Sequence, residues 1–183
     1  MIVFIHIPKT AGVSIRVASA SIGQAFKTLY HEPVKSAYLY KDLKDTDFVI
    51  TSTRNPYDRA VSLFYFLRKN TGYSTLFIQD QTVSQFWETF NEHVTFTQPQ
   101  CYFLKDANNK VSERINKIIR FETLKEDWRE LQQNYNLPPL PHENINEARP
   151  AIHWQDELTH AAIERIGEIY ADDFEHLGYK RLY

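Results

Sequence analysis

Short strand-forming runs alternate with helical stretches along this chain, and this alternation constrains its fold more than any other feature. Ile2–Ile7 is β-branched and aromatic and is stopped by Pro8, which is typical of a buried strand. Further strands are expected at residues 26–30, 47–53 and 117–121. Helices are expected at residues 15–21, 36–43, 55–69, 83–91, 123–135 and 158–177. Strands that alternate with helices predict an α/β fold of three layers, with a central parallel sheet flanked by helices.

The length of 183 residues predicts a single domain over residues 1–183. Residues 72–113 are rich in aromatic side chains and helical in character, and we expect them as an insertion beside the sheet. A Thr123-x-x-Glu126 capping box is expected to begin the helix that follows the last strand.

Composition excludes several classes of protein. The formal net charge of −2 is unlike the basic balance of a nucleic-acid-binding surface. The single cysteine, Cys101, excludes an intramolecular disulfide and a cysteine-rich zinc site. No apolar run approaches the roughly 18 residues of a membrane-spanning helix. No signal-peptide pattern is present, so a cytoplasmic protein is expected.

The first strand joins its helix through residues 8–14, Pro-Lys-Thr-Ala-Gly-Val-Ser. Backbone N–H groups at a helix start, a glycine that permits close approach, one lysine and two hydroxyls are suited to bind a phosphate. This is not a Walker A loop, because the lysine precedes the glycine. The alternative interpretation is a plain turn with a solvated Lys9.

A second junction lies where Arg54 follows a strand and Asn55-Pro56 opens a helix. Asn55 and Ser62 are two helical turns apart, roughly 10 Å along the axis. An arginine that reaches along this helix face could share one phosphate with the Ser62 hydroxyl. The alternative is that Arg54 pairs with Asp58 and that Ser62 faces solvent.

Together the two junctions are more specific than either alone. Residues 4–14 resemble the 5′-phosphosulfate-binding loop of sulfotransferases, and residues 54–62 resemble their 3′-phosphate-binding motif. Order and spacing fit the carbohydrate sulfotransferase branch with its Golgi enzymes and bacterial relatives. Weaker matches at residues 99–104, 120–124 and 170–179 extend the resemblance over nearly the whole chain.

The resemblance implies sulfuryl transfer from 3′-phosphoadenosine-5′-phosphosulfate (PAPS) to an acceptor hydroxyl, with a P-loop-like fold and no metal. Lys9 would bind the 5′-phosphosulfate and follow the charge that moves to the leaving group. The rest of the loop would hold the same group through N–H and hydroxyl donors: Thr10, Ala11, Gly12, Val13 and Ser14. Relatives often have a hydroxyl residue at the position of Val13, so Ser14 would serve alone. Arg54 and Ser62 would grip the 3′-phosphate, and Arg149 is a second candidate phosphate ligand.

A general base is needed because a protonated alcohol is a weak nucleophile. His31 lies at the predicted end of the second strand, on the edge where parallel sheets bind ligands. In relatives, a histidine between the two phosphate motifs often acts as the base. Glu32 and His93 are the alternatives. His6 lies within a strand and is interpreted as structural.

The acceptor side is expected in residues 72–113, with Gln100 and His93 as candidate contacts to a sugar, lipid or other small molecule. This stretch has five acidic and two basic residues, a balance that disfavours a polyanionic acceptor. Two other functions remain open: a nucleoside-phosphate kinase, and a module that binds PAPS or its product 3′-phosphoadenosine-5′-phosphate (PAP) without catalysis.

Overall fold

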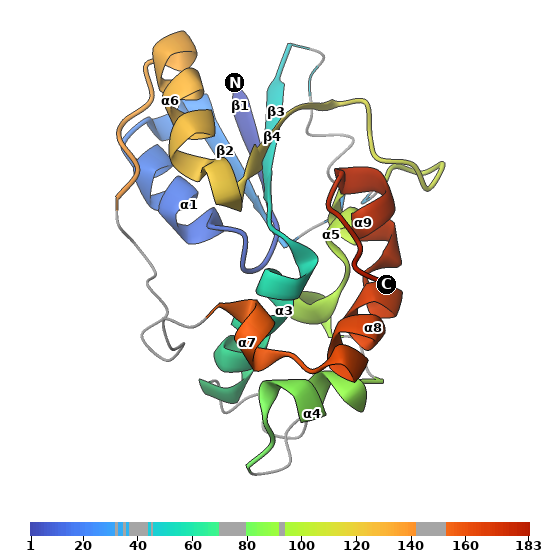
Figure 1. Cartoon of the computed structure of the whole chain (residues 1–183). Helices are drawn as coiled ribbons and strands as arrows, with labels where there is room; N and C mark the ends of the chain where they lie inside the picture. The colour runs from blue at the N-terminus through green and yellow to red at the C-terminus, as the bar shows by residue number, and fades with distance from the viewer. Residues whose placement is uncertain are drawn as a thin grey trace. The chain divides into compact units, whose positions relative to one another are not determined.

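The computed structural model describes residues 1–31, 33–34, 36, 44, 46–69, 80–91, 94–141 and 153–183 (Figure 1). The chain divides into two compact units. The sheet unit comprises Met1–Arg54 and Gln100–Ile145, and the helical unit comprises Asn55–Pro99 and Asn146–Tyr183. The chain therefore leaves the sheet unit after Arg54, builds part of the helical unit, and returns at Gln100.

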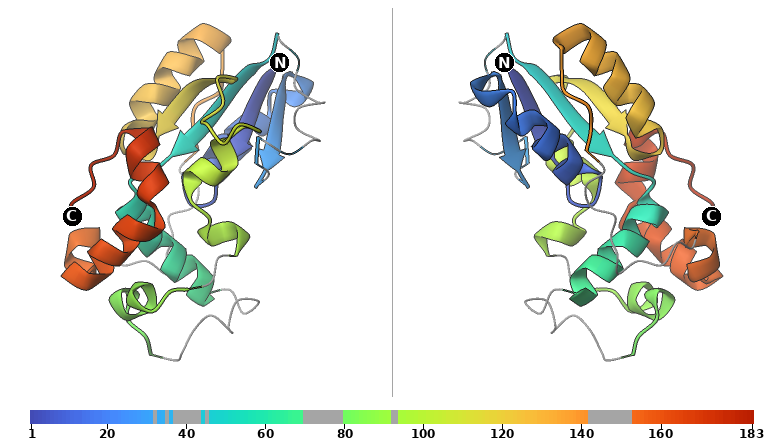
Figure 2. Two further views of the ribbon diagram at one scale, coloured as in Figure 1. Left: turned by 90° about the vertical axis from the view of Figure 1, so that its right-hand side faces the viewer. Right: turned by 90° about the vertical axis from the view of Figure 1, so that its left-hand side faces the viewer.

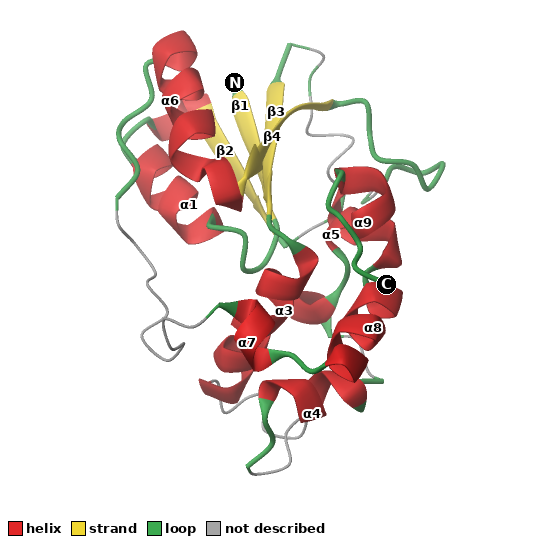
Figure 3. Cartoon of the chain, in the orientation of Figure 1, coloured by secondary structure: helices red, strands yellow, loops and turns green. Residues whose placement is uncertain are grey.

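The sheet unit is built on four parallel strands, shown in yellow in Figure 3. The strands are β1 (Ile2–His6), β2 (Phe26–Tyr30), β3 (Phe48–Thr53) and β4 (Ile115–Arg120). Their order is β2-β1-β3-β4. The central position of β1 explains its unbroken run of buried residues, because a strand inside a covered parallel sheet is buried on both faces.

Helices cover the sheet on both sides, and Figure 2 shows the strands from two further directions. On one side lie α1 (Gly12–Ala20) and α6 (Leu124–Tyr135), and on the other lies the short α5 (Gln100–Leu104) (Figure 1). Phe4, Ile50 and Trp128 belong to the core on the α1 and α6 side. The α/β fold with a central parallel sheet flanked by helices is confirmed.

The helical unit is formed around an aromatic core. Its α-helices are α3 (Pro56–Lys69), α4 (Val83–Glu88), α7 (Trp154–Glu157), α8 (His160–Ile169) and α9 (Ala171–Leu177). Trp87 is fully buried between them, and its indole Nε1 donates to the carbonyl of Ala60 at 3.2 Å. None of the described helices combines the length and hydrophobicity that a membrane crossing requires.

Four sequence expectations need comment. Thr123 begins α6 but makes no capping bond; its hydroxyl donates to Asp127 at 2.9 Å, so the predicted capping box is wrong. The final helix expected over 158–177 is two helices, α8 and α9, which are separated at Tyr170. The helix expected over 83–91 ends at Glu88. The helix expected at 36–43 lies largely outside the described residues.

The expected insertion at 72–113 is shared between the two units. Residues 80–99 belong to the helical unit and residues 100–113 to the sheet unit. Residues 72–79 lie outside the described part of the chain. Two short 3-10 turns, Gly23–Ala25 and Phe121–Thr123, lead into β2 and α6, and a third, Thr95–Thr97, precedes Pro99.

The helical unit encloses a charged side chain, Arg59 of α3, which has no exposed surface. Its Nη2 donates to the carbonyls of Phe96 at 3.1 Å and Gln98 at 3.0 Å. Burial lowers the pKa of Arg59, while the neighbouring Tyr170 and the buried carboxylate of Asp173 oppose that shift. A guanidinium is not deprotonated in proteins, so a charged group ties the segment before Pro99 to α3.

We predict that Arg59→Met destabilises the protein by about 3–5 kcal/mol, because Asp173 then stays buried without its compensating charge. Urea denaturation of the full chain measures the change. Arg68→Met is the matched control, since Arg68 is an exposed arginine on the same helix and its loss is expected to cost within about 0.5 kcal/mol. Equal losses for the two variants would contradict a special role for Arg59.

Candidate active site

The carboxyl ends of all four strands lie at one edge of the sheet unit, because the strands are parallel. His31 follows β2, the turn with Lys9 follows β1, Arg54 follows β3, and Phe121 follows β4. This edge is where open α/β sheets place their ligands.

The turn after β1 has an unusual backbone. Lys9 and Ala11 adopt left-handed conformations, with φ of 66° and 72°. Each costs roughly 1–2 kcal/mol for a residue with a Cβ atom. The Thr10 hydroxyl between them donates to the carbonyl of Ile7 at 2.9 Å and lies 2.8 Å from the Ser52 hydroxyl of β3. These buried bonds hold the turn in place, and turns with left-handed residues are a type of backbone that binds anions in other proteins.

The turn leads directly into α1. Ala11 is its N-cap residue and makes no side-chain capping bond. The partial positive charge of the helix dipole therefore faces the turn. Ser14, in the first turn of α1, is 7% exposed. Such an end is suited to a phosphate or sulfate group.

Gly12 is required here by close packing against the His6 side chain. A Cβ atom at Gly12 would lie 1.9 Å from Cδ2 and 2.1 Å from Nε2 of His6. The imidazole is 3% exposed and also contacts the rings of Tyr30 and His31, at centroid distances of 4.7 and 4.8 Å. Gly12 and the end of β2 are therefore joined through one buried ring.

His6 is neutral in this environment. Burial is the main cause that lowers its pKa to about 3, with smaller contributions from His31, Arg16 and Lys9. Its Nδ1 is buried and has no hydrogen-bond partner among the described residues. An unsatisfied buried polar atom costs roughly 1–3 kcal/mol.

His31 has two fixed points in the sheet unit. Its N–H donates to the carbonyl of His6 at 3.2 Å, and its ring lies 4.1 Å from that of Tyr30. Its φ of 58° is left-handed, a conformation in which histidine occurs more often than most residues. The imidazole is half-buried, so it keeps access to solvent while its backbone is held.

Arg54 is held on three sides. Its guanidinium carbon lies 3.8 Å above the ring of Phe121, and Nη1 donates to the carbonyl of Lys9 at 3.4 Å. Its backbone N–H donates to Oε1 of Gln100 at 2.8 Å, and its carbonyl accepts from Nε2 of Gln100 at 2.9 Å. Gln100 has no exposed surface and fixes the arginine backbone. The contact of Gln100 with an acceptor remains a prediction.

Ser62 lies on α3 of the helical unit and is 3% exposed. The expected cap of this helix is present, because Oδ1 of Asn55 accepts from the N–H of Tyr57 at 3.0 Å. That Ser62 shares a phosphate with Arg54 remains a prediction.

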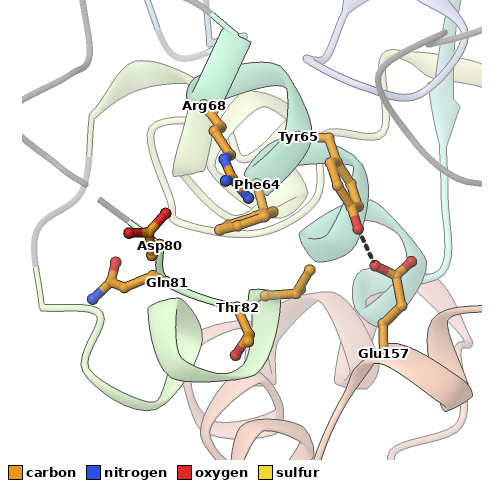
Figure 4. A pocket seen from close by; sticks show the side chains of 8 residues that line it. Phe64, Tyr65, Arg68, Asp80, Gln81, Thr82 and Glu157 are labelled. Carbon is orange, nitrogen blue, oxygen red and sulfur yellow. Dashed lines mark hydrogen bonds between the residues drawn. The ribbon is translucent and has the colours of Figure 1, made fainter. Parts of the chain in front are cut away.

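The helical unit contains an open pocket of about 370 Å³ between α3, residues 80–83 and the end of α7 (Figure 4). Tyr65 and Glu157 point toward each other across one side, with the hydroxyl donating to Oε2 at 2.5 Å. On the other side the Arg68 guanidinium lies 5.8 Å from the Phe64 ring centroid. Part of the expected acceptor-side segment thus lines a pocket of mixed charge.

A family model described as Sulfotransferase family matches residues 1–180. The chain belongs to the sulfotransferase family. The resemblance that the two junctions indicated is confirmed at the level of the family, and the match supports sulfuryl transfer as the general activity. A search of the curated proteins finds no match.

In this sulfotransferase the sheet unit brings together the residues expected from both phosphate motifs, Lys9 and Arg54, with His31 at the same sheet edge. Three candidates, Glu32, His93 and Arg149, lie outside the described residues. Sequence reasoning missed the contact of His6 with Gly12 and the support of Arg54 by Phe121. No spacing rule signals either contact, because both depend on which strand ends become neighbours.

We predict that Gly12→Ala destabilises the sulfotransferase by about 1–3 kcal/mol through overpacking against His6. In the His6→Ala background the same change should cost less, because the new methyl group enters the space left by the imidazole. Chemical denaturation of the four proteins should give a coupling of about 0.5–3 kcal/mol. Gly167→Ala is the control: its Cβ would meet the flexible end of Arg181. Additive effects at Gly12 and His6 would refute the packing argument.

We also predict a pH dependence of stability from His6. The unfolded chain binds a proton at His6 near pH 6.5, whereas the folded protein binds it only near pH 3. Stability is therefore lost as the pH falls below 6.5, by up to about 1.4 kcal/mol per pH unit. Between pH 6 and 4 the His6→Asn variant should lose less stability per pH unit than the parent. Parallel curves for the two proteins would show that His6 does not contribute.

Proposed function

We propose that this sulfotransferase moves a sulfuryl group from PAPS to an acceptor hydroxyl by in-line displacement. The observation that carries the proposal is the 3.4 Å contact between the Arg54 guanidinium and the Lys9 carbonyl. It joins two motifs 45 residues apart at one sheet edge. A nucleotide with phosphate groups on both its 5′ and 3′ positions is the kind of ligand that engages two such motifs at once.

The 5′-phosphosulfate would bind at the turn after β1. Support comes from the left-handed backbone at Lys9 and Ala11 and from the start of α1, whose N-cap residue Ala11 makes no side-chain capping bond. In this proposal the N–H groups of residues 10–14 hold the group, aided by the hydroxyl of Ser14. The hydroxyl of Thr10 supports the turn through Ile7 and Ser52, so its contribution to the donor is through its N–H group.

The 3′-phosphate would be bound by Arg54, with Ser62 and Arg149 as further proposed ligands. A guanidinium stacked on Phe121 is oriented before the phosphate arrives, so less conformational entropy is lost on binding. The two hydrogen bonds from Gln100 fix the backbone from which this side chain extends. Arg54 would thereby distinguish PAPS from ATP, which has no 3′-phosphate.

The chemistry follows from these positions. The acceptor oxygen attacks sulfur and forms the new S–O bond, while His31 takes the hydroxyl proton. The bond from sulfur to the bridging oxygen of the 5′-phosphate breaks, and its electron pair stays on that oxygen. The Lys9 ammonium and the backbone N–H groups stabilise the charge that develops there. Because these groups supply the electrostatic stabilisation, we propose a metal-independent reaction.

For the acceptor we propose a hydroxyl of a carbohydrate or another small molecule rather than a polyanion. The acidic balance of residues 72–113 supports this choice. The pocket lined by Tyr65 and Glu157 adds hydrogen-bonding groups in part of this segment. Gln100 and His93 remain proposed acceptor contacts.

The donor assignment is tested by thermal shift with PAP, ATP with magnesium, and AMP. PAP at a hundredfold excess over its Kd is expected to stabilise the protein by about 2.7 kcal/mol, and ATP is expected to stabilise it far less. Arg54→Ala should weaken PAP by roughly 2–5 kcal/mol and leave AMP nearly unchanged, because AMP lacks the 3′-phosphate. Arg129→Ala, an exposed arginine of α6, is the matched control and should change neither ligand.

Equal stabilisation by PAP and ATP would remove the donor assignment and favour a nucleoside-phosphate kinase. Binding of PAP without turnover of PAPS would favour a non-catalytic binding module. If Arg54→Ala lowered the affinity for PAP and for AMP alike, Arg54 would support the fold rather than bind the 3′-phosphate.

A further inference from the structure

We propose that His6 is a positioning residue for His31, which it holds at a fixed distance from the donor loop by packing between His31 and Gly12. The inference rests on the proposed function, in which His31 is the base. It assigns a role in the reaction to a strand histidine that the sequence alone indicated as structural.

The first support is the place of the His6 ring. Its Cδ2–Nε2 edge occupies the position that a Cβ of Gly12 would take, and the ring lies 4.8 Å from the His31 ring. Tyr30 contacts it edge-on at 4.7 Å, and Phe4 stacks on it at 5.8 Å. The imidazole therefore lies between the donor loop and His31, with aromatic partners that restrict its movement.

The second support is the backbone. The carbonyl of His6 accepts the N–H of His31, so backbone and side chain of the same residue both contact His31. His31 is in a left-handed conformation, which persists only where surrounding contacts determine it. Removal of the His6 ring leaves the main-chain bond and the contact with Tyr30, and takes away the ring contact that lies on the side of Gly12.

The third support is that the His6 side chain buries a polar atom at a cost in stability. Its Nδ1 is buried without a partner among the described residues, so a histidine here is less favourable for folding than an apolar side chain of similar shape. This polar atom lowers the stability of the fold, and its ring contacts Gly12 and His31, two residues of the proposed site. The combination points to a functional constraint on the His6 ring.

The expected consequence is a loss of turnover with little loss of donor binding. Misplacement of a reacting group by about 1 Å can reduce the rate by about 10²-fold. The donor loop keeps its Thr10 bonds in the absence of His6. We therefore expect His6→Ala to lower kcat by about 10–100-fold, with the KM for PAPS and the Kd for PAP changed less than about threefold.

The experiment is a double-mutant cycle on the full chain, with slow hydrolysis of PAPS as the reaction and water as the nucleophile. The four proteins are the parent, His6→Ala, His31→Ala and the double variant. If His6 acts through His31, the double variant turns over at the rate of His31→Ala alone. If the rate losses of the two single variants multiply in the double variant, the inference is overturned. Such independence would mean that His6→Ala lowers the rate by disturbing the structure and not through His31.

Val3→Ala is the matched control, because Val3 is a fully buried residue of the same strand. It should lower the melting temperature but leave kcat and the His31 ring signals unchanged. NMR of the His31 ring, assigned by its absence in His31→Ala, provides a readout without turnover. His6→Ala should shift these signals, and unchanged signals would overturn the inference. If His6→Ala does not fold, His6→Asn takes its place in the cycle with the same expectations.

The two proposals fail in different ways. A parent protein that does not bind PAP would refute the proposed donor and this inference with it. A parent that binds PAP, with full turnover in His6→Ala or in His31→Ala, would leave the donor assignment intact and refute the positioning role.

Discussion

The parallel pairing of β1 with both β2 and β3 is the constraint on which the candidate site depends. Register sets His6 beside Tyr30, and it sets Ile5 beside Leu29 on one side and Thr51 on the other. The Thr51 hydroxyl reinforces this pairing by donating to the carbonyl of Ile5 at 3.0 Å. Because a one-residue slip would turn every side chain to the other face, the register also decides which side chains reach the sheet edge.

At that edge, strained backbone is balanced by tertiary hydrogen bonds. Lys9, Ala11 and His31 all have positive φ angles although none of them is a glycine. The compensating bonds come from other segments: Ser52 to Thr10, Arg54 to the Lys9 carbonyl, and the His31 N–H to His6. The shape of the turn after β1 is therefore a property of the assembled sheet unit, and the isolated loop sequence would not hold it.

Two buried titratable groups show how surroundings decide charge. Burial lowers the pKa of Arg59, and the nearby Asp173 opposes this shift while two backbone carbonyls accept its hydrogen bonds. Burial among aromatic rings, with smaller contributions from positively charged neighbours, lowers the pKa of His6 to about 3. Desolvation acts on both, and the difference lies in whether an acceptor or a negative charge is within reach.

The sequence by itself determined the strands, the helix after each phosphate motif and the family, because hydrophobic periodicity, Pro8, Asn55-Pro56 and the motif residues are local signals. It failed where a local signal met a competing partner, as when the Thr123 hydroxyl bonded Asp127 instead of capping its helix. Only the tertiary structure decided that Gly12 accommodates His6, that Phe121 supports Arg54 and that Gln100 holds the Arg54 backbone. These contacts join segments that are distant in the chain, and their energy depends on the order and register of strands, which no short stretch of sequence specifies.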